Sequence, residues 1–327
     1  MNRIFLYLKL KKMITEQRQY YRPFEYEEAY NFYIKQQLVH WTKDEIKMAQ
    51  DLQDWKYNLT DAEKKVVGGI LKGFTQMEIL VGDYWRNVAN WFPKPEIAMM
   101  ASVNSYFETI HQSSYAMINE ELGLDDFQAF LHDEETKAKL EYFMNNPNSS
   151  DIFDIARSLA VFSAFAEGCL LFSSFAVLLS FQKENLLKGV SQIVNFSIRD
   201  EEIHSQGGIY LFNTLCKENL HIRKSLEQDI LEAAKLTKDL EFAFIDKLFE
   251  NNTIRTLSKE QLKNFITHKI NVKLKGLGYE AQFYVSQELL QEMSWFDELS
   301  SGQKIGDFFA VRVSDYTDVN FKATDLF

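Results

Sequence analysis

The sequence predicts an all-helical bundle, and three observations carry that prediction. Apolar residues recur with helical periodicity through nearly the whole chain, whereas the alternation typical of a half-buried strand is almost absent. The 327 residues include only four prolines, and residues 148–327 include none, which favours long helices because proline removes a backbone donor. Hydrophobic residues make up 46% of the chain, enough for a sizeable core.

The chain is expected to divide into an N-terminal arm over 1–22, a helical domain over 23–293 and a flexible C-terminal tail over 294–327. Residues 1–13 faintly resemble a signal peptide, but their apolar run is short, is broken by Lys9 and precedes no small-residue cleavage site. We therefore expect the first dozen residues to be a disordered arm, or Met13 to be the biological start.

Local signals position the helices along the chain. Thr60 and Glu63 form a capping box at the start of the first long helix. Pro95 suits the first position of the next one. Beyond Trp295 the sequence becomes irregular and charged. The expected helices cover about 60–90, 95–122, 151–181, 186–215, 221–250 and 258–293, with a more polar stretch over 124–150 that includes a loop at 145–150.

One segment, 158–181, is apolar enough to need a separate explanation. It has 24 residues and one charge, a length that could span a bilayer. Glu167 near its middle would be expensive in lipid, no second comparable span exists, and the flanking charges show no asymmetry. We therefore predict the central helix of a bundle rather than a membrane protein.

Composition excludes several other classes. The net charge of −11 and the pI near 5.2 argue against a nucleic-acid partner, which needs a basic surface. The two cysteines, Cys169 and Cys216, are not in CxxC spacing and give neither a disulfide framework nor a zinc site. A reducing cytoplasm is the expected location.

Two Glu-x-x-His pairs are the candidate chemistry: Glu108 with His111, and Glu201 with His204. Residues three apart on a helix share a face, so each pair can offer a carboxylate and an imidazole to one metal ion. Either pair alone is weak evidence, because such a spacing also arises by chance.

The spacing of two further glutamates strengthens this interpretation. Glu78 precedes Glu108 by 30 residues with the turn at Pro93 midway, and Glu167 precedes Glu201 by 34 with the turn at 182–185 midway. In an antiparallel hairpin, residues equidistant from the turn lie at one height, here roughly 20–25 Å from it. Four carboxylates and two histidines are therefore expected to meet at one level of a four-helix bundle.

The apolar pattern indicates that these carboxylates are buried. Glu78 lies on an inward stripe, whereas Asp83 sits about 140° round the same helix and is expected in solvent. Buried carboxylates must be paired, protonated or metal-bound. Four glutamates balance two divalent cations, and carboxylate with imidazole suits iron or manganese. The inward stripe of the Glu78 helix consists of Val67, Ile70, Leu71, Phe74, Val81 and Trp85.

Three more residues are candidates because of their neighbours. Tyr115 lies one turn after His111, close enough for its phenol to approach a metal pair. Asp200 could accept a hydrogen bond from a metal-ligating histidine. Trp41 lies in the segment Val-His-Trp-Thr. The plain alternatives are a core tyrosine, a surface charge and a packing aromatic.

The pattern as a whole resembles ferritin-like bundles with two iron or manganese ions. Segments 107–115 and 199–204 further resemble the two signature helices of the class I ribonucleotide reductase small subunit, and the resemblance extends over about 22–327. It implies a radical at Tyr115, an electron route through Trp41 and Asp200, and a tail tyrosine at Tyr316. It also implies six metal ligands, namely Glu78, Glu108, His111, Glu167, Glu201 and His204.

The resemblance also implies an activity and partners. A reduced pair of iron, manganese or mixed ions would react with an oxygen-derived oxidant and oxidise Tyr115, and the oxidising equivalent would pass to a large subunit that reduces ribonucleotides to deoxyribonucleotides for DNA replication. The tail, with Phe321, Leu326 and Phe327, would dock on that large subunit, and the chain would form a homodimer. Most relatives have Asp at the position of Glu78, and Ser197 replaces an apolar neighbour of the tyrosine, so the metals and the radical location stay open.

Two rival classes share the metal site. A ferritin-type storage protein explains the ligands but leaves the chain length, Tyr115, Trp41 and the tail without a role. A di-metal oxygenase or oxidase would need a substrate cavity beside the metals.

Overall fold

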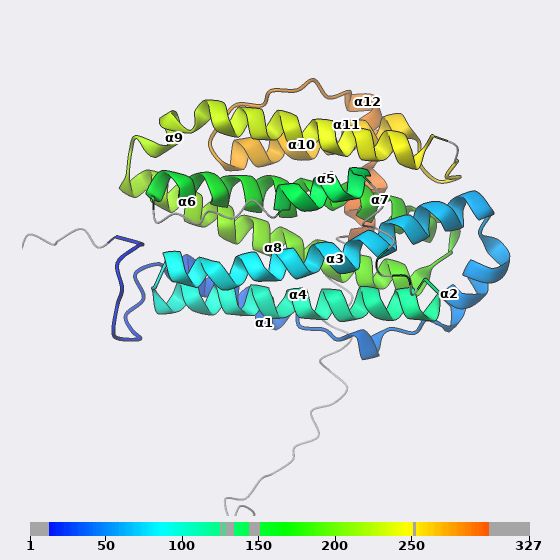
Figure 1. Ribbon diagram of the computed structural model, residues 1–327, viewed down its shortest axis with the longest axis horizontal. Helices are drawn as coiled ribbons and strands as arrows, with labels where there is room; N and C mark the ends of the chain where they lie inside the picture. Colours follow the sequence, from blue (N-terminus) through cyan, green and yellow to red (C-terminus); the bar gives the residue numbers. More distant parts are fainter. Residues whose placement is uncertain are drawn as a thin grey trace, which may run out of the picture.

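The computed structural model of the chain describes residues 13–124, 126, 128, 134–143, 151–250 and 253–300. These described residues form helices and connecting turns with no strand, so the all-helical prediction is confirmed (Figure 1). The α-helices are α1 (Glu27–Leu38), α2 (Ala49–Gln53), α3 (Asp61–Trp91), α4 (Pro95–Glu121), α5 (Glu134–Phe143), α6 (Ile152–Leu159), α7 (Phe172–Ser180), α8 (Lys188–Glu218), α9 (Ile222–Ser225), α10 (Glu227–Leu248), α11 (Lys259–Gly276) and α12 (Gln287–Glu292). Short helices of other types are η1 (Lys43–Glu45), η2 (Asp54–Asn58), η4 (Ala160–Leu170) and η5 (Phe181–Glu184).

The long helices run roughly along the long axis of the molecule. Figure 1 shows α3 and α4 side by side along one edge and α10 and α11 along the other, with α6 and α8 between them. The predicted inward stripe of α3 is buried throughout, whereas Asp83 is exposed and pairs with Arg86. The core therefore lies where the α3 stripe meets η4 and α8.

The first helix pair follows its local signals. Thr60 accepts a hydrogen bond from the backbone of Glu63, whose carboxylate accepts one from the backbone of Thr60, so the capping box begins α3 as predicted. Pro95 occupies the first turn of α4. These chain-local features set the antiparallel α3–α4 hairpin.

The apolar segment is a core helix, as predicted. Within the described residues, Ile152–Glu184 is the one helix long and apolar enough to cross a membrane, and 94% of its apolar window is buried in the protein. Its middle, η4, is a π-helix rather than an α-helix. A one-residue change of helical phase leaves no trace in a segment that is apolar on every side, so the sequence pattern did not indicate it.

The predicted helix over 258–293 is wrong in its second half. α11 ends at Gly276, because Gly278 adopts a left-handed φ of 84°. The backbone N–H of Tyr279 bonds the Leu274 carbonyl at 3.0 Å and that of Gly278 bonds Lys275 at 2.9 Å, a Schellman ending. A separate helix, α12, starts after its cap Ser286.

Three other boundaries also differ from expectation. The predicted helix over 221–250 is two helices, α9 and α10, and α8 continues to Glu218. Residues 294–300, expected to be irregular tail, are helical. They are held by Phe296, which is buried with its ring 4.8 Å from that of Phe265. The rest of the predicted tail, 301–327, lies outside the described residues.

The described part of the expected N-terminal arm packs on the bundle. Ile14 is fully buried, and its N–H donates to the Glu218 carboxylate at 2.9 Å. Arg18 forms a buried ion pair with Glu96 at the start of α4. Residues 1–12 lie outside the described residues.

Candidate metal centre

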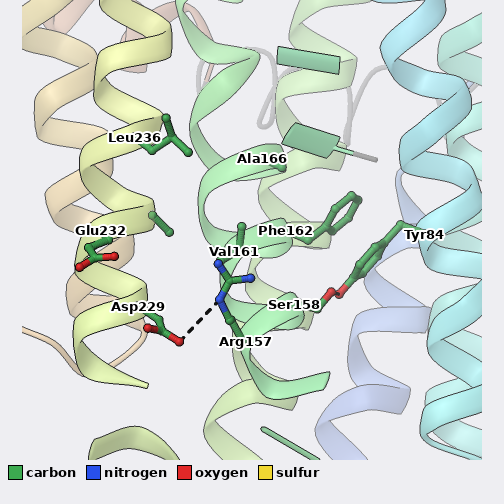
Figure 2. Close-up of a pocket in the computed structure, with 10 residues that line it drawn as sticks. Tyr84, Arg157, Ser158, Val161, Phe162, Ala166, Asp229, Glu232 and Leu236 are labelled. Atoms are coloured by element: carbon green, nitrogen blue, oxygen red, sulfur yellow. Dashed lines mark hydrogen bonds and ion pairs between the residues drawn. The ribbon is translucent and has the colours of Figure 1, made fainter. Parts of the chain in front are cut away.

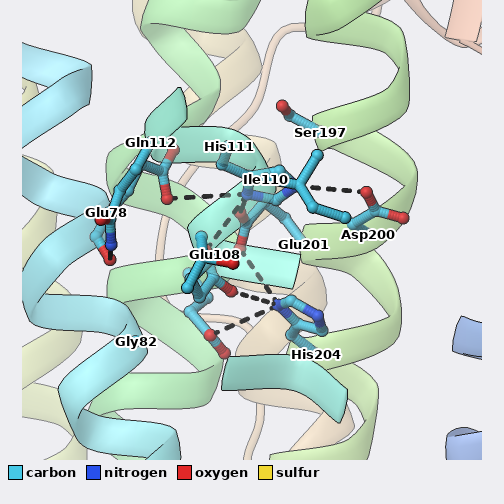
Figure 3. A network of polar contacts seen from close by, with 12 residues as sticks. Glu78, Gly82, Glu108, Ile110, His111, Gln112, Ser197, Asp200, Glu201 and His204 are labelled. Carbon is cyan, nitrogen blue, oxygen red and sulfur yellow. Dashed lines mark hydrogen bonds and ion pairs between the residues drawn. The ribbon is translucent and has the colours of Figure 1, made fainter. Parts of the chain in front are cut away.

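Four core helices bring six side chains together in the bundle. Figure 3 labels five of them, namely Glu78, Glu108, His111, Glu201 and His204. α3 supplies Glu78, α4 supplies Glu108 and His111, η4 supplies Glu167, and α8 supplies Glu201 and His204. All six side chains are completely buried. The structure therefore places together every residue that the sequence nominated as a metal ligand.

The six side chains divide into two groups of four. In each group the ligand atoms lie within 4.8 Å of one another. Glu108 and Glu201 belong to both groups. One group is completed by Glu78 and His111, the other by Glu167 and His204. Two ions with two shared carboxylates fit this arrangement.

The distances show how closely the carboxylates surround each imidazole. His111 Nδ1 lies 3.1 Å from Glu108 Oε2, 3.2 Å from Glu201 Oε1 and 3.7 Å from Glu78 Oε2. His204 Nδ1 lies 2.7 Å from Glu108 Oε1 and 3.8 Å from both Glu167 Oε1 and Glu201 Oε2.

Many polar atoms of this cluster have no hydrogen-bond partner among the described residues. They include both carboxylate oxygens of Glu78, Oε2 of Glu167 and Oε2 of Glu201. Buried polar groups are normally paired, because an unpaired one is destabilising. Here the ligand atoms of each group lie within 4.8 Å of one another, so one cation could bind the unpaired oxygens of a group together. The donor set of oxygen and imidazole nitrogen fits iron or manganese.

The pKa values of the clustered carboxylates also favour cation binding. Burial raises the pKa of Glu78 and of Glu201 to about 8, and raises that of Glu167 well above its usual range. Burial also acts on Glu108, but the neighbouring His204 and His111 hold its pKa below its usual value. So much buried negative charge requires either protons or cations, so cation binding would release protons from the cluster.

Asp200 connects the cluster to Trp41. One oxygen of Asp200 accepts hydrogen bonds from Trp41 Nε1 at 2.7 Å and from His111 Nε2 at 3.1 Å. The Trp41 and His111 rings stack with centroids 5.9 Å apart. Because His111 Nε2 faces Asp200, Nδ1 is the ring nitrogen that faces Glu108 and Glu201. All three residues are buried.

Tyr115 lies one turn beyond His111 and is fully buried. Its hydroxyl donates to Ser197 Oγ at 2.9 Å, and its ring packs 4.8 Å from that of Phe74. Burial, and the negative charge of Glu78 after it, raise the pKa of Tyr115 well above its usual value.

Two polar contacts of the site were not foreseen from the sequence. Trp85 Nε1 donates to Glu167 Oε1 at 2.5 Å, and Gln36 Nε2 donates to Asp200 Oδ1 at 2.9 Å. The apolar pattern places Trp85 on the inward stripe of α3 but does not predict its hydrogen bond. Its place two turns after Glu78 on that stripe was the signal that it lies beside the cluster.

A cavity of about 320 Å³ opens between η4 and α10 (Figure 2). Tyr84, Phe162 and Ala166 line it, and an ion pair between Arg157 and Asp229, 3.8 Å apart, lies at its edge. None of the six clustered residues lines this cavity. It therefore does not offer a substrate direct access to the cluster, as an oxygenase would require.

The predicted tail residues Tyr316, Phe321, Leu326 and Phe327 lie outside the described residues.

Comparison with known proteins gives consistent matches. The family model of the ribonucleotide reductase small chain matches residues 18–289. The probable ribonucleoside-diphosphate reductase small subunit 376L of Invertebrate iridescent virus 6 is 32% identical over 345 aligned positions, covering 94% of this chain and 96% of that protein.

Two solved structures share the fold. A putative class I ribonucleotide reductase from Bacillus halodurans superimposes with a TM-score of 0.75 at 21% identity, covering 84% of this chain and 99% of that one. The dimanganese(II)-NrdF of Streptococcus sanguinis gives 0.72 at 20% identity, covering 86% and 98%. The predicted ferritin-like bundle is thereby confirmed.

Proposed function

The chain belongs to the family of ribonucleotide reductase small chains, and from that premise we propose that its core holds two metal ions that generate the radical used in nucleotide reduction. As a ribonucleoside-diphosphate reductase small subunit it is part of an oxidoreductase and works with a large subunit. The observation that carries the metal proposal is the pair of four-residue groups sharing Glu108 and Glu201.

In this proposal Glu78 and His111 would hold one ion and Glu167 and His204 the other, with Glu108 and Glu201 within reach of both. The ions are iron, manganese or one of each, which the carboxylate and imidazole donors suit. The similar fold of the dimanganese(II) protein of Streptococcus sanguinis supports manganese as one candidate. When bound, the metal pair supplies the oxidising power for the radical.

The residues around the cluster store the radical and carry the electron. Tyr115 stores the radical, with Ser197 Oγ, 2.9 Å from the phenol, as acceptor of the hydrogen bond. Trp41 and Asp200 carry the electron between the cluster and the surface, and the hydrogen bond of Asp200 to His111 Nε2 keeps that imidazole oriented.

The remaining parts of the proposal concern assembly. The C-terminal tail docks on the large subunit through Phe321, Leu326 and Phe327, with Tyr316 as a relay between the two subunits. The chain works as a homodimer in the cytoplasm. The family resemblance supports these assignments, and the acidic charge of −11 agrees with a partner other than nucleic acid.

Metal stoichiometry tests the central assignment. Reconstituted wild-type protein should bind two ions per chain, and Glu201→Ala should lose the bound pair because it removes a shared carboxylate and leaves buried groups unpaired. Asp83→Ala is the matched control, since Asp83 is an exposed acid on the same helix as Glu78. It should bind as wild type does. Elemental analysis of desalted protein measures both, and a wild-type value well under two ions would refute the proposal.

A further inference from the structure

The π-helical segment η4 carries Glu167 and needs an explanation. It extends over Ala160–Leu170, and all its residues except Val161 are buried. π-helices are rare and mostly limited to single turns inside α-helices. A π-helical stretch of eleven residues therefore requires support from its surroundings, above all at the point where the chain returns to α-helix.

A buried ion pair provides that support at the end of η4. Lys139 on α5 and Glu241 on α10 have side chains 1% and 0% exposed, with Nζ 2.5 Å from Oε1. Lys139 Nζ also donates to the backbone carbonyl of Leu170 at 3.0 Å. Leu170 is the last residue of the π-helix. Both α5 and α10 pack directly against η4.

Stabilisation of the folded protein does not by itself explain why an ion pair is buried at the end of η4. Removing a lysine and a glutamate from water is so unfavourable that apolar residues of similar volume often stabilise a core as well or better. An apolar pair, however, could not donate a hydrogen bond to one chosen carbonyl. A charged N–H donor is among the stronger hydrogen-bonding groups in a protein interior, and Glu241 neutralises its charge.

We propose that Lys139 and Glu241 are positioning residues that hold the end of the π-helix and so fix the direction in which Glu167 points. Glu167 precedes Leu170 by three residues. A shift of one residue in helical phase turns a side chain by about 100°, which would take the Glu167 carboxylate away from His204 and Glu201. This inference rests on the proposed function, in which Glu167 binds the second metal ion.

The test uses the double variant Lys139→Met/Glu241→Gln, which keeps side-chain volume and removes the donor and both charges. Full-length apoprotein is titrated anaerobically with Mn(II), and electron paramagnetic resonance follows the free and bound ion. We expect the ion near Glu78 and His111 to bind nearly as in wild type. Affinity for the ion near Glu167 should fall by about 10–100-fold, and the coupled two-ion spectrum should give way to a single-ion spectrum.

Lys94→Met/Glu25→Gln is the matched control, because Lys94 is similarly buried and lies 2.8 Å from Glu25 in the turn that precedes α4. It should keep the coupled spectrum. If the Lys139→Met/Glu241→Gln variant binds two coupled ions with wild-type affinity, the inference is overturned. If that variant does not fold while the control variant does, the inference is also overturned, because the ion pair is then needed for folding itself. Wild-type protein that binds fewer than two ions would instead refute the proposed function.

Discussion

Tyr115 shows how much one residue depends on its immediate surroundings. Burial raises its pKa well above the usual value, so the phenol stays protonated at neutral pH. Its oxidation must therefore move a proton together with the electron. The Ser197 hydroxyl, 2.9 Å away, accepts the phenolic hydrogen bond and so orients the phenol, but as a neutral alcohol it does not itself hold the proton.

Replacing this phenol tests where the radical resides. Activated wild-type protein should give a tyrosyl signal in electron paramagnetic resonance, and Tyr115→Phe should lack it because the oxidisable hydroxyl is gone. Tyr84→Phe is a matched control, since Tyr84 is also a buried, hydrogen-bonded tyrosine. Its signal should match wild type. If Tyr115→Phe still supports full nucleotide reduction, the oxidising equivalent is held on the metals.

At this scale the sequence predicted which side chains meet but not all of their partners. Glu78, Glu108, Glu167 and Glu201 could be placed at one height because the rise of a helix is constant. The contact between Trp85 and Glu167 could not be placed in the same way. A hydrogen bond between helices depends on the rotation and offset of both, and spacing along the chain does not define these.

The start of α3 illustrates how an element is held by both local and distant groups. Glu63 completes the capping box with Thr60 and also binds Arg255, with Nη2 2.6 Å from Oε2. Although burial opposes the charge, Arg255 and Thr60 lower the pKa of Glu63 from 4.5 to about 2. Its charged form therefore stabilises the folded protein.

This shift predicts a pH-dependent stability difference. Glu63→Gln should lower the free energy of unfolding at pH 7 by about 1 kcal/mol, allowing for solvent screening of the part-exposed Arg255. Because the pKa is depressed on folding, the advantage of wild type is complete above 4.5 and disappears as the pH falls towards 2. Urea unfolding at several pH values measures it.

The ends of elements were predictable where one local signal dominated. Thr60 and Pro95 set the starts of α3 and α4. The end of α11 was missed because apolar periodicity continues past it, although Gly278 was a visible signal for a left-handed ending. The π-helix was missed for a different reason, since its geometry depends on contacts such as that of Lys139 from another helix.

At the scale of the whole molecule, the proposed function assigns separate tasks to the buried Glu and His cluster and to the tail. The cluster is enclosed by α3, α4, η4 and α8, whereas residues 301–327 follow the last described helix. The proposed docking role of the tail comes from its apolar anchors and from the family resemblance. A short apolar-anchored segment that orders on binding gives moderate affinity.

Deleting residues 320–327 should separate these tasks. The shortened chain should keep its fold, its metal content and the Tyr115 signal, but it should no longer associate with the large subunit in sedimentation. Tyr316→Phe should keep association and lose turnover, because only the relay hydroxyl is removed. A shortened chain that still binds the large subunit and supports nucleotide reduction would contradict the docking role.

The central helix also has a consequence for how the chain is made. Ile152–Glu184 has the length and apolar character of a membrane span, and the helices that cover it include α8, α10 and α11, all later in the chain. During synthesis this segment leaves the ribosome before those partner helices have emerged. Until α11 has emerged, the nascent chain presents an uncovered segment of the kind that membrane-targeting factors and chaperones bind. We therefore expect production of this subunit to depend on shielding one helix until α8, α9, α10 and α11 have been translated.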